Sequence, residues 1–185
     1  MKTKNKAIDA TTYAFSAGEQ ILVDANIWLY LCPPAAQPRP SWAVSYTNAF
    51  SRLLKAKAVP MVDALALSEF LNRYVRIEYD ASWKGTYPKF KAFRQSSDSA
   101  QVLSAAVAEI NLILQAATSC DSLLAATNIS DVLSAVEAGT IDLNDGLLIE
   151  NCRINGWKLM TNDADIKVGG IEVLTAHKGL LASCP

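Results

Sequence analysis

The chain has 185 residues, 51% hydrophobic and 19% charged, which is the balance of an ordinary globular domain with a full core. Its formal net charge of −1 excludes a generally basic nucleic-acid binder, so a polyanionic partner would have to meet a local basic patch. The four cysteines show no Cys-x-x-Cys spacing and there is one histidine, which argues against a zinc site and against histidine-based catalysis.

Residues 1–19 are polar and irregular, and we expect them to form either a loosely attached arm or a first edge element. They lack the apolar core of a signal peptide, and no apolar run reaches membrane-spanning length. Cysteines without pairing spacing fit a reducing compartment. These features predict a single cytoplasmic domain over 1–185 that makes no membrane contact.

The next stretch predicts a short strand over 20–25. Its apolar run Ile21-Leu22-Val23 ends abruptly at Asp24, and a helix is expected from Asn26. In α/β proteins such a strand end delivers polar groups into the crevice where ligands bind. The alternative is that Asp24 or Asn26 only caps the helix that follows.

A connector with four prolines over 33–40 separates this unit from a series of helices and short strands. We expect helices over 42–57, 64–79, 97–117, 130–138 and 145–155, and strands over 59–62, 157–160 and 171–174. Ser41 and Asn144 are the expected N-caps of two of these helices, and Gly156 is the expected C-terminal stop. Residues 81–140 predict a helical insertion or hairpin. The alternation predicts an α/β protein with a largely parallel sheet.

Four acidic residues fall at element boundaries or on an apolar helix face: Asp24, Glu69, Asp145 and Asp163. Because parallel strands end at one edge of a sheet, Asp24 and Asp163 should be neighbours if their strands are adjacent. Carboxylates that close together repel one another and rise in pKa unless a cation lies among them. Oxygen ligands without histidine or cysteine favour Mg²⁺ or Mn²⁺.

Each of these acids has a simpler alternative. Glu69 could form an i,i+4 ion pair with Arg73 on a solvated face. Asp145 could be a first-turn acid that favours the helix dipole. Asp163 and Asp165 could be turn residues. Three further acids are weaker candidates: Asp121, Asp142 and Glu150.

The order of the acids resembles the pattern of the PIN-domain family of metal-dependent ribonucleases. The resemblance runs from about Ile21 to Leu174 and rests on four short motifs. They are Val23-Asp24-Ala25-Asn26, Leu67-Ser68-Glu69-Phe70, Asn144-Asp145-Gly146-Leu147-Leu148-Ile149 and Leu159-Met160-Thr161-Asn162-Asp163-Ala164-Asp165-Ile166. This resemblance implies a PIN-like three-layer α/β/α fold with a mostly parallel central sheet.

By the same resemblance, Asp24, Glu69, Asp145 and Asp163 would hold Mg²⁺ or Mn²⁺ and would hydrolyse RNA phosphodiester bonds. Asp165 would bind a second metal ion or only close the turn. A further implied role is that of Asn26 and Thr161, which would orient the first and last carboxylates by hydrogen bonds.

The resemblance also implies partners. Many small single-domain members are VapC-type toxins that pair with an antitoxin, so we expect an RNA substrate, an antitoxin protein and a homodimer. Three features depart from the minimal pattern: the Asp145-Gly146 pair replaces the usual Asp-Ala, the interval after Glu69 is long, and the segment 33–40 is rich in proline.

An acidic cleft repels RNA, so basic residues should flank it. Over 83–94 basic and aromatic residues interleave, which suits single-stranded RNA. The basic candidates are Lys84, Lys89, Lys91, Arg94 and, one turn after Glu69, Arg73. The alternatives are a short amphipathic helix with Phe90 and Phe93 packed inward, or a protein interface.

A metal-dependent endoribonuclease is therefore the leading hypothesis. A haloacid-dehalogenase-like phosphotransferase is disfavoured because Asn26 stands where that family needs a second aspartate. A nucleotide-binding module is disfavoured because the chain contains neither a GxGxxG motif nor a P-loop. The main alternative is a catalytically silent PIN-like domain that binds RNA or protein, which would be favoured if the acids lay far apart.

Overall fold

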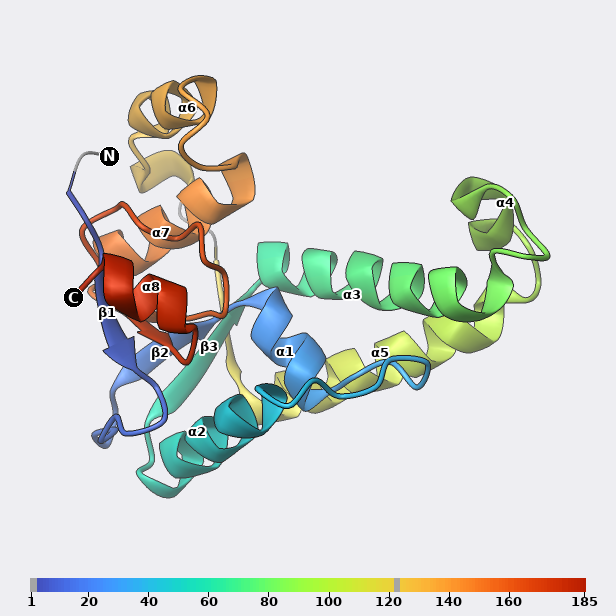
Figure 1. The fold of residues 1–185 in the computed structure, drawn as a ribbon, viewed down its shortest axis with the longest axis horizontal. Helices are drawn as coiled ribbons and strands as arrows, with labels where there is room; N and C mark the ends of the chain where they lie inside the picture. The colour runs from blue at the N-terminus through green and yellow to red at the C-terminus, as the bar shows by residue number, and fades with distance from the viewer. Residues whose placement is uncertain (1–2, 122–123) are drawn as a thin grey trace.

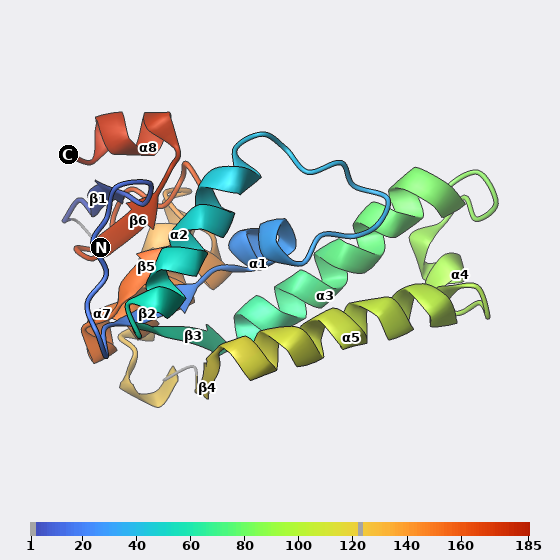
Figure 2. The ribbon, with the colours of Figure 1, turned by 90° about the horizontal axis from the view of Figure 1, so that it is seen from below.

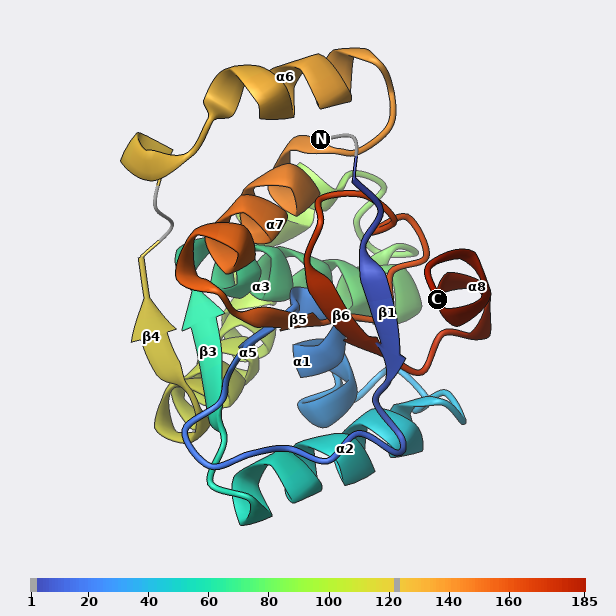
Figure 3. The ribbon, with the colours of Figure 1, turned by 90° about the vertical axis from the view of Figure 1, so that its left-hand side faces the viewer.

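The computed structural model of the chain describes residues 3–121 and 124–185. Within them, six strands form one sheet in the order β1-β6-β5-β2-β3-β4, with every neighbouring pair parallel. The strands are β1 (Lys6–Asp9), β2 (Gln20–Val23), β3 (Val59–Asp63), β4 (Thr118–Cys120), β5 (Lys158–Met160) and β6 (Glu172–Thr175). Figure 3 shows β4 and β1 at the two edges of this sheet.

Helices cover both faces of the sheet. They are α1 (Ala25–Leu31), α2 (Ala43–Lys55), α3 (Ala64–Glu78), α4 (Phe90–Arg94), α5 (Ser99–Ala116), α6 (Ile129–Glu137), α7 (Leu143–Asn155) and α8 (Lys178–Ser183). A short π-helix, η1 (Tyr79–Trp83), continues α3, and a 3₁₀ turn, η2 (Leu124–Ala126), precedes α6.

Strand β2 shows why the fold has three layers. Ile21 and Val23 pack into the core formed with α1, α2, α3 and α5. Leu22, between them, packs into the core formed with α6, α7 and α8. Successive side chains of a strand point to opposite faces, so an unbroken apolar run is covered on both sides. The expected three-layer α/β/α arrangement with a mostly parallel sheet is confirmed.

Helices α3 and α5 form a long hairpin that projects away from the sheet, with α4 at its far end (Figures 1 and 2). The far end is closed by aromatic packing around the fully buried Phe93, against which the rings of Tyr79, Trp83, Tyr87 and Phe90 lie at centroid distances of 5.5 to 6.5 Å. This confirms the inward packing considered for the aromatic residues of 83–94. We call this projection the α3–α5 arm.

The two edge strands stand differently against the sequence, because the first edge element was one of two expectations for residues 1–19 and a strand at 118–120 was not expected. Residues 6–9 form edge strand β1, paired with β6, so the edge element and not the loosely attached arm is the correct alternative for them. Residues 118–120 form the other edge strand, β4, so the segment 81–140 is not a purely helical insertion. Three or four residues at a sheet edge carry too little apolar alternation to be recognised. The parts of these two segments at 1–2 and 122–123 lie outside the described residues.

The expected helices agree with the structure to within a few residues, but two caps differ. Trp42, and not Ser41, precedes α2. At the start of α7 the backbone N–H of Asp145 donates to the Asp142 carboxylate at 2.8 Å, so Asp142 replaces Asn144 as the cap. Gly156 ends α7 with φ +69°, as expected of a glycine stop.

Helix α5 is, within the described ranges, the one helix that meets the length and composition test for a membrane span. A single such helix is weak evidence, because core helices pass the same test. In the sequence, Gln101, Glu109 and Asn111 interrupt the apolar residues of this helix, so no unbroken apolar run of this length is present. In this structure α5 packs along α3.

Gly146 allows α6 to lie close against α7. A Cβ atom at this position would lie 2.6 Å from Cγ1 of Val132 on α6, and valine has little rotamer freedom to move away. We expect Gly146→Ala to lower the free energy of unfolding by about 1 kcal/mol, since overpacking costs more than the helix gains from alanine. Urea unfolding measures the change.

The matched control is the same substitution in a Val132→Ala background. Without the valine methyl groups, the added Cβ atom meets the Cβ atom of residue 132 at 3.7 Å, an ordinary contact, so there Gly146→Ala should be neutral or stabilising. An equal loss of stability in both backgrounds would contradict this account of the packing.

Candidate active site

The candidate site lies where the neighbouring strands β2 and β5 end. Val23 and Met160 are paired in register, and the backbone N–H of Asp24 donates to the Met160 carbonyl at 3.1 Å. The residues that follow the two strands therefore leave the same edge of the sheet side by side. The expectation that Asp24 and the 161–163 turn are neighbours is confirmed.

Asp24 is almost fully buried, with 4% of its surface exposed. Its Oδ2 accepts hydrogen bonds from the Thr161 hydroxyl at 2.6 Å and from the Asn26 side-chain amide, which also donates to Thr161 Oγ1 at 3.0 Å. Asp24 makes no side-chain cap bond to α1, so helix capping does not explain it. The hydrogen bonds expected of Asn26 and Thr161 are present for the first carboxylate, Asp24, whereas Thr161 contacts Asp163 only through the backbone N–H of Asp163, at 3.0 Å.

The turn after β5 is held by further polar contacts. Asn26 Oδ1 accepts from the backbone N–H of Asn162 at 3.1 Å. The Tyr46 hydroxyl donates to Asn162 Oδ1 at 2.7 Å, and the Asn162 amide donates to the Tyr30 hydroxyl at 3.1 Å. The two tyrosines were missed because, without their tertiary partners, aromatic residues in apolar helices are indistinguishable from core residues.

The pKa of Asp24 is raised to about 6, first by burial and then by the charges of Glu69 and Asp163. The hydrogen bonds from Thr161 and Asn26 oppose this rise because they stabilise the charged form. Since Glu69 belongs to α3 and Asp163 follows β5, carboxylates from three elements act on one another at this edge of the sheet.

Asp145, in the first turn of α7, belongs to the same cluster. Its pKa is raised to about 8, first by burial and then by Asp142, Asp163, Asp24 and Glu69 in that order. The structure therefore brings the four acids singled out in the sequence within electrostatic reach of one another. We call Asp24, Glu69, Asp145 and Asp163 the acidic cluster.

The structure contains the contacts proposed by two of the simpler alternatives, those for Glu69 and for Asp163. Glu69 accepts a hydrogen bond from Arg73 at 3.1 Å, in an i,i+4 ion pair on a partly exposed face. Asp163 Oδ1 accepts from the backbone N–H of Asp165 at 2.8 Å, so Asp163 shapes its own turn. Because these contacts coexist with the electrostatic coupling, they do not exclude a second role for either acid.

A cleft of about 690 Å³ lies against part of the cluster. Its lining is Gly139, Thr140, Ile141, Asp142, Asp145, Asp163, Asp165, Lys167 and Val168. Asp165 is exposed and lies 3.7 Å from Lys167, and it is not among the charges that raise the pKa of Asp24 or Asp145. Asp165 therefore lies at the rim. Lys167, which no sequence motif marks, is a basic group in this cleft.

The other basic candidates lie elsewhere. Lys84, Lys89, Lys91 and Arg94 are exposed residues at the far end of the α3–α5 arm, where Lys84 lies 3.6 Å from Asp80. Lys84 follows Glu69 by fifteen residues along α3 and η1, which at helical rise is about 20 Å. The structure does not bring these four residues to the acidic cluster. Of the candidates, Arg73 alone lies beside it.

The acidic cluster has donors of the right kind for a hard divalent cation, since all its side-chain ligands would be carboxylate oxygens. Across the residues that the structure describes, however, no three histidine, cysteine, aspartate or glutamate side chains are grouped closely enough to hold a metal ion. Like charges in a poorly solvated site separate when no cation lies among them. Metal binding would therefore require side-chain movement within the cluster.

Raised pKa values make the stability of the metal-free protein depend on pH. The Asp145 carboxyl titrates near pH 8 in the folded chain and near its ordinary value of 3.8 when unfolded. Between these limits the folded state binds more protons, so its stability should fall as pH rises. We expect the thermal midpoint, measured with a chelator present, to be lower at about pH 8 than at about pH 5.

Asp145→Asn should reduce the drop in thermal midpoint between about pH 5 and about pH 8, because the titrating carboxyl is gone. Glu137→Gln, at an exposed acid of α6, is the control and should leave the drop in thermal midpoint unchanged. A pH dependence that is identical in the two variants would show that Asp145 is not the responsible group.

No protein-family model and no curated protein sequence matches the chain. Several solved structures are similar to it, including the two that follow. The structure of VapBC2 from Rickettsia felis bound to a DNA fragment from their promoter aligns with a TM-score of 0.55 at 15% identity, covering 84% of this chain and 98% of that chain. PAE2754 from Pyrobaculum aerophilum aligns with a TM-score of 0.46 at 16% identity, covering 85% and 92%.

At 15% identity the first likeness establishes a fold and not an activity. VapC is a PIN-domain toxin. The order of the parallel strands, the helical layers on both faces and the likeness to VapBC2 together show that this chain has the VapC-like PIN-domain fold.

Proposed function

We propose that the chain is a metal-dependent endoribonuclease and the toxin of a toxin–antitoxin pair. The observation that carries the proposal is the acidic cluster: carboxylates from four separate elements raise the pKa of Asp24 and Asp145 at one edge of the sheet. Clustered like charges destabilise a fold, so their presence calls for a function that uses them. The VapC-like fold supports the same reading.

Mg²⁺ or Mn²⁺, bound by Asp24, Glu69, Asp145 and Asp163, would activate a water and stabilise charge on the phosphodiester. The chain's own residues prepare this site. Thr161 and Asn26 hold the Asp24 carboxylate in one orientation by hydrogen bonds. Near neutral pH, Asp145 would release its proton when a cation binds, since its pKa is about 8 without one. Asp165, at the rim, is a further candidate ligand.

RNA would enter along the cleft beside Asp145 and Asp163. Arg73 and Lys167 lie close enough to the acids to contact phosphates there. Lys84, Lys89, Lys91 and Arg94 would contact only an RNA that extends about 20 Å along the α3–α5 arm. We further propose a cytoplasmic location, an antitoxin that covers the acidic cleft, and a homodimer.

A catalytically silent PIN-like domain that binds RNA or protein is the second candidate. It is favoured by one observation, that no three potential ligands in the described part of the chain are grouped as a metal site. Metal binding distinguishes the two candidates without any assumption about the RNA sequence.

Calorimetric titration with Mn²⁺ is the direct test of the proposed site. The wild-type chain should bind Mn²⁺ and cleave single-stranded RNA, whereas Asp24→Asn and Asp145→Asn should lose both properties. The substitutions keep the side-chain volume while removing a charged ligand. Glu137→Gln should bind and cleave like the wild type, because that acid is exposed on α6 and lies outside the cleft lining.

Two outcomes would contradict the proposal. If Mn²⁺ binds equally well to the wild type and to both variants, the cation site lies elsewhere. If no form binds Mn²⁺ and no form cleaves RNA with metal present, the chain is the silent binding domain.

Thr161 provides a test of positioning. Thr161→Val removes the hydroxyl that donates to Asp24 at 2.6 Å and keeps the shape of the side chain. Loss of such an orienting contact typically weakens metal affinity by about 10- to 100-fold, and we expect a change of this size in Mn²⁺ affinity. The control is Thr47→Val, at an exposed position of α2. Unchanged affinity in Thr161→Val would show that the hydroxyl is not needed to orient Asp24.

A further inference from the structure

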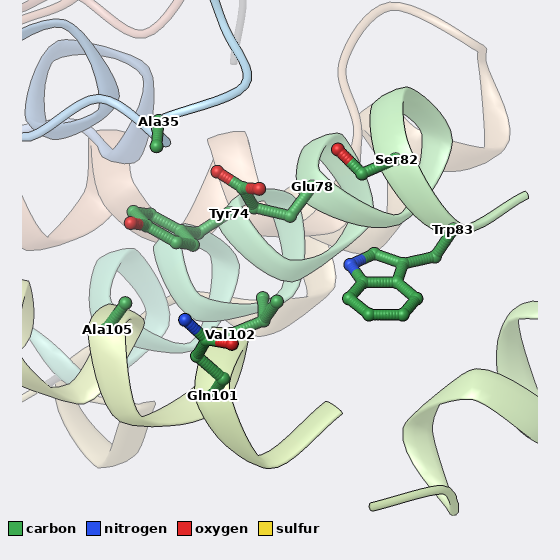
Figure 4. Close-up of a pocket in the computed structure, with 8 residues that line it drawn as sticks. All are labelled: Ala35, Tyr74, Glu78, Ser82, Trp83, Gln101, Val102 and Ala105. Carbon is green, nitrogen blue, oxygen red and sulfur yellow. The ribbon is translucent and has the colours of Figure 1, made fainter. Parts of the chain in front are cut away.

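A second pocket, partly open to solvent, lies along the α3–α5 arm, away from the acidic cluster. Its volume is about 270 Å³, and α3, η1, α5 and the proline-rich connector contribute its walls (Figure 4). The lining residues are Ala35, Tyr74, Glu78, Ser82, Trp83, Gln101, Val102 and Ala105. Glu78 follows Glu69 by nine residues, which is about 2.5 helical turns, so the two side chains leave opposite faces of α3. The pocket is therefore separate from the proposed nuclease site.

The charged group in the pocket lining is an acid. Of its eight lining residues, Glu78 alone is charged. Its Oε1 accepts from the backbone N–H of Ala36 at 3.0 Å, which fixes the direction of the carboxylate. Glu109 lies nearby on α5, because the pKa of the buried Tyr74 phenol is raised first by burial and then by Glu78 and Glu109. A carboxylate in the lining attracts a cation at short range, although Arg39 also acts on this region through Cys32.

The polar groups of the lining are free to bind a ligand. Among the residues that the structure describes, the side chains of Ser82, Trp83 and Gln101 make no hydrogen bond. Figure 4 shows the Trp83 indole nitrogen turned toward the side of the pocket where Glu78 and Gln101 lie. The carboxylate, the hydroxyl and the amide oxygen are acceptors, while the indole N–H and the amide NH₂ are donors.

The walls between these polar groups are apolar or aromatic, from Tyr74, Trp83, Val102 and Ala105. Such walls suit the methylene stem of a long side chain and the flat face of a guanidinium group. A volume of about 270 Å³ is below the usual range for drug-sized ligands, so the pocket fits a single amino-acid side chain and not a nucleotide.

The backbone gives independent support for a function here. Ser82 and Trp83 belong to η1, the π-helix that interrupts the end of α3. π-Helical turns are rare and are frequently found at functional sites. In this chain the widened turn supplies two of the polar groups that face the pocket.

We propose that this pocket binds a guanidinium group on an apolar stem, with Glu78 as its counter-ion and with Ser82 and Gln101 as further acceptors. A guanidinium group carries five N–H donors in a plane, which matches the acceptors present. The Trp83 N–H and the Gln101 NH₂ are placed to meet a carbonyl or carboxylate at the other end of the stem. Free arginine and an arginine residue of a polypeptide both offer this chemistry.

The test uses the full chain without metal or RNA, so its outcome is independent of the nuclease proposal. The probes are N-acetyl-arginine methylamide, free arginine and the neutral isostere N-acetyl-citrulline methylamide. Binding is followed through the indole N–H resonance of Trp83, assigned with Trp83→Phe. We expect a saturable shift with the arginine probes and at least about tenfold weaker binding of the citrulline probe, because one charge-assisted contact is lost.

Glu78→Gln is the decisive variant, since its amide oxygen can still accept from Ala36 N–H while the charge is gone. It should bind the arginine probes at least about tenfold more weakly, and Glu137→Gln should bind them like the wild type. Tighter binding of N-acetyl-arginine methylamide would assign the pocket to an arginine residue of a polypeptide. Tighter binding of free arginine would assign it to a small molecule.

Three results would overturn the proposal. They are equal binding of the arginine and citrulline probes, unchanged binding by Glu78→Gln with a wild-type thermal midpoint, or a Trp83 shift caused by guanosine and not by arginine. The last result would identify a pocket for a nucleobase.

Discussion

The contact between the ends of β2 and β5 is the constraint on which the rest of the site depends. Register pairing of Val23 with Met160 fixes where each strand stops, and the hydrogen bond from Thr161 to Asp24 joins the two turns that follow. Asn26 donates to both residues and accepts from the backbone of Asn162. A carboxylate that is 4% exposed is therefore held by neutral donors and not by a basic side chain.

The neutral donors leave the negative charge of the site uncompensated, which costs stability. Neutral hydrogen bonds lower the pKa of Asp24 but do not offset its burial and the neighbouring charges of Glu69 and Asp163. The only described ion pair of a cluster member is that of Glu69 with Arg73, at the partly exposed side. The protein thus keeps a local excess of negative charge at the edge of its sheet, at a cost in stability that a bound cation would relieve.

Helix α3 separates two regions of different chemistry. One face carries Glu69 and Arg73 beside the acidic cluster, and the opposite face carries Tyr74 and Glu78 in the pocket of the α3–α5 arm. The basic residues at the far end of the arm are distant from both the cleft and the sheet (Figure 1). The charge of this chain, −1 in total, is therefore unevenly distributed, with acids gathered at the sheet edge and basic residues at the far end of the arm.

The sequence by itself determined the α/β class, the principal helices and the acids of the cluster. Local patterns predict these features: apolar runs that end in a carboxylate, helical spacing of apolar residues, and a glycine at the end of α7. The sequence left β1 as one of two alternatives and did not predict β4, because pairing with β6 and β3, and not their own residues, makes these short segments strands.

Only the tertiary structure decided which polar residues meet. The order β5-β2-β3 is set by how the helices pack on both faces of the sheet, and no local pattern encodes it. That order brought Thr161 to Asp24, placed Tyr46 on the 161–163 turn, and carried the basic residues of 84–94 away from the acids at the end of a long helix. Residue type is local information, whereas proximity between distant residues arises from packing the whole chain.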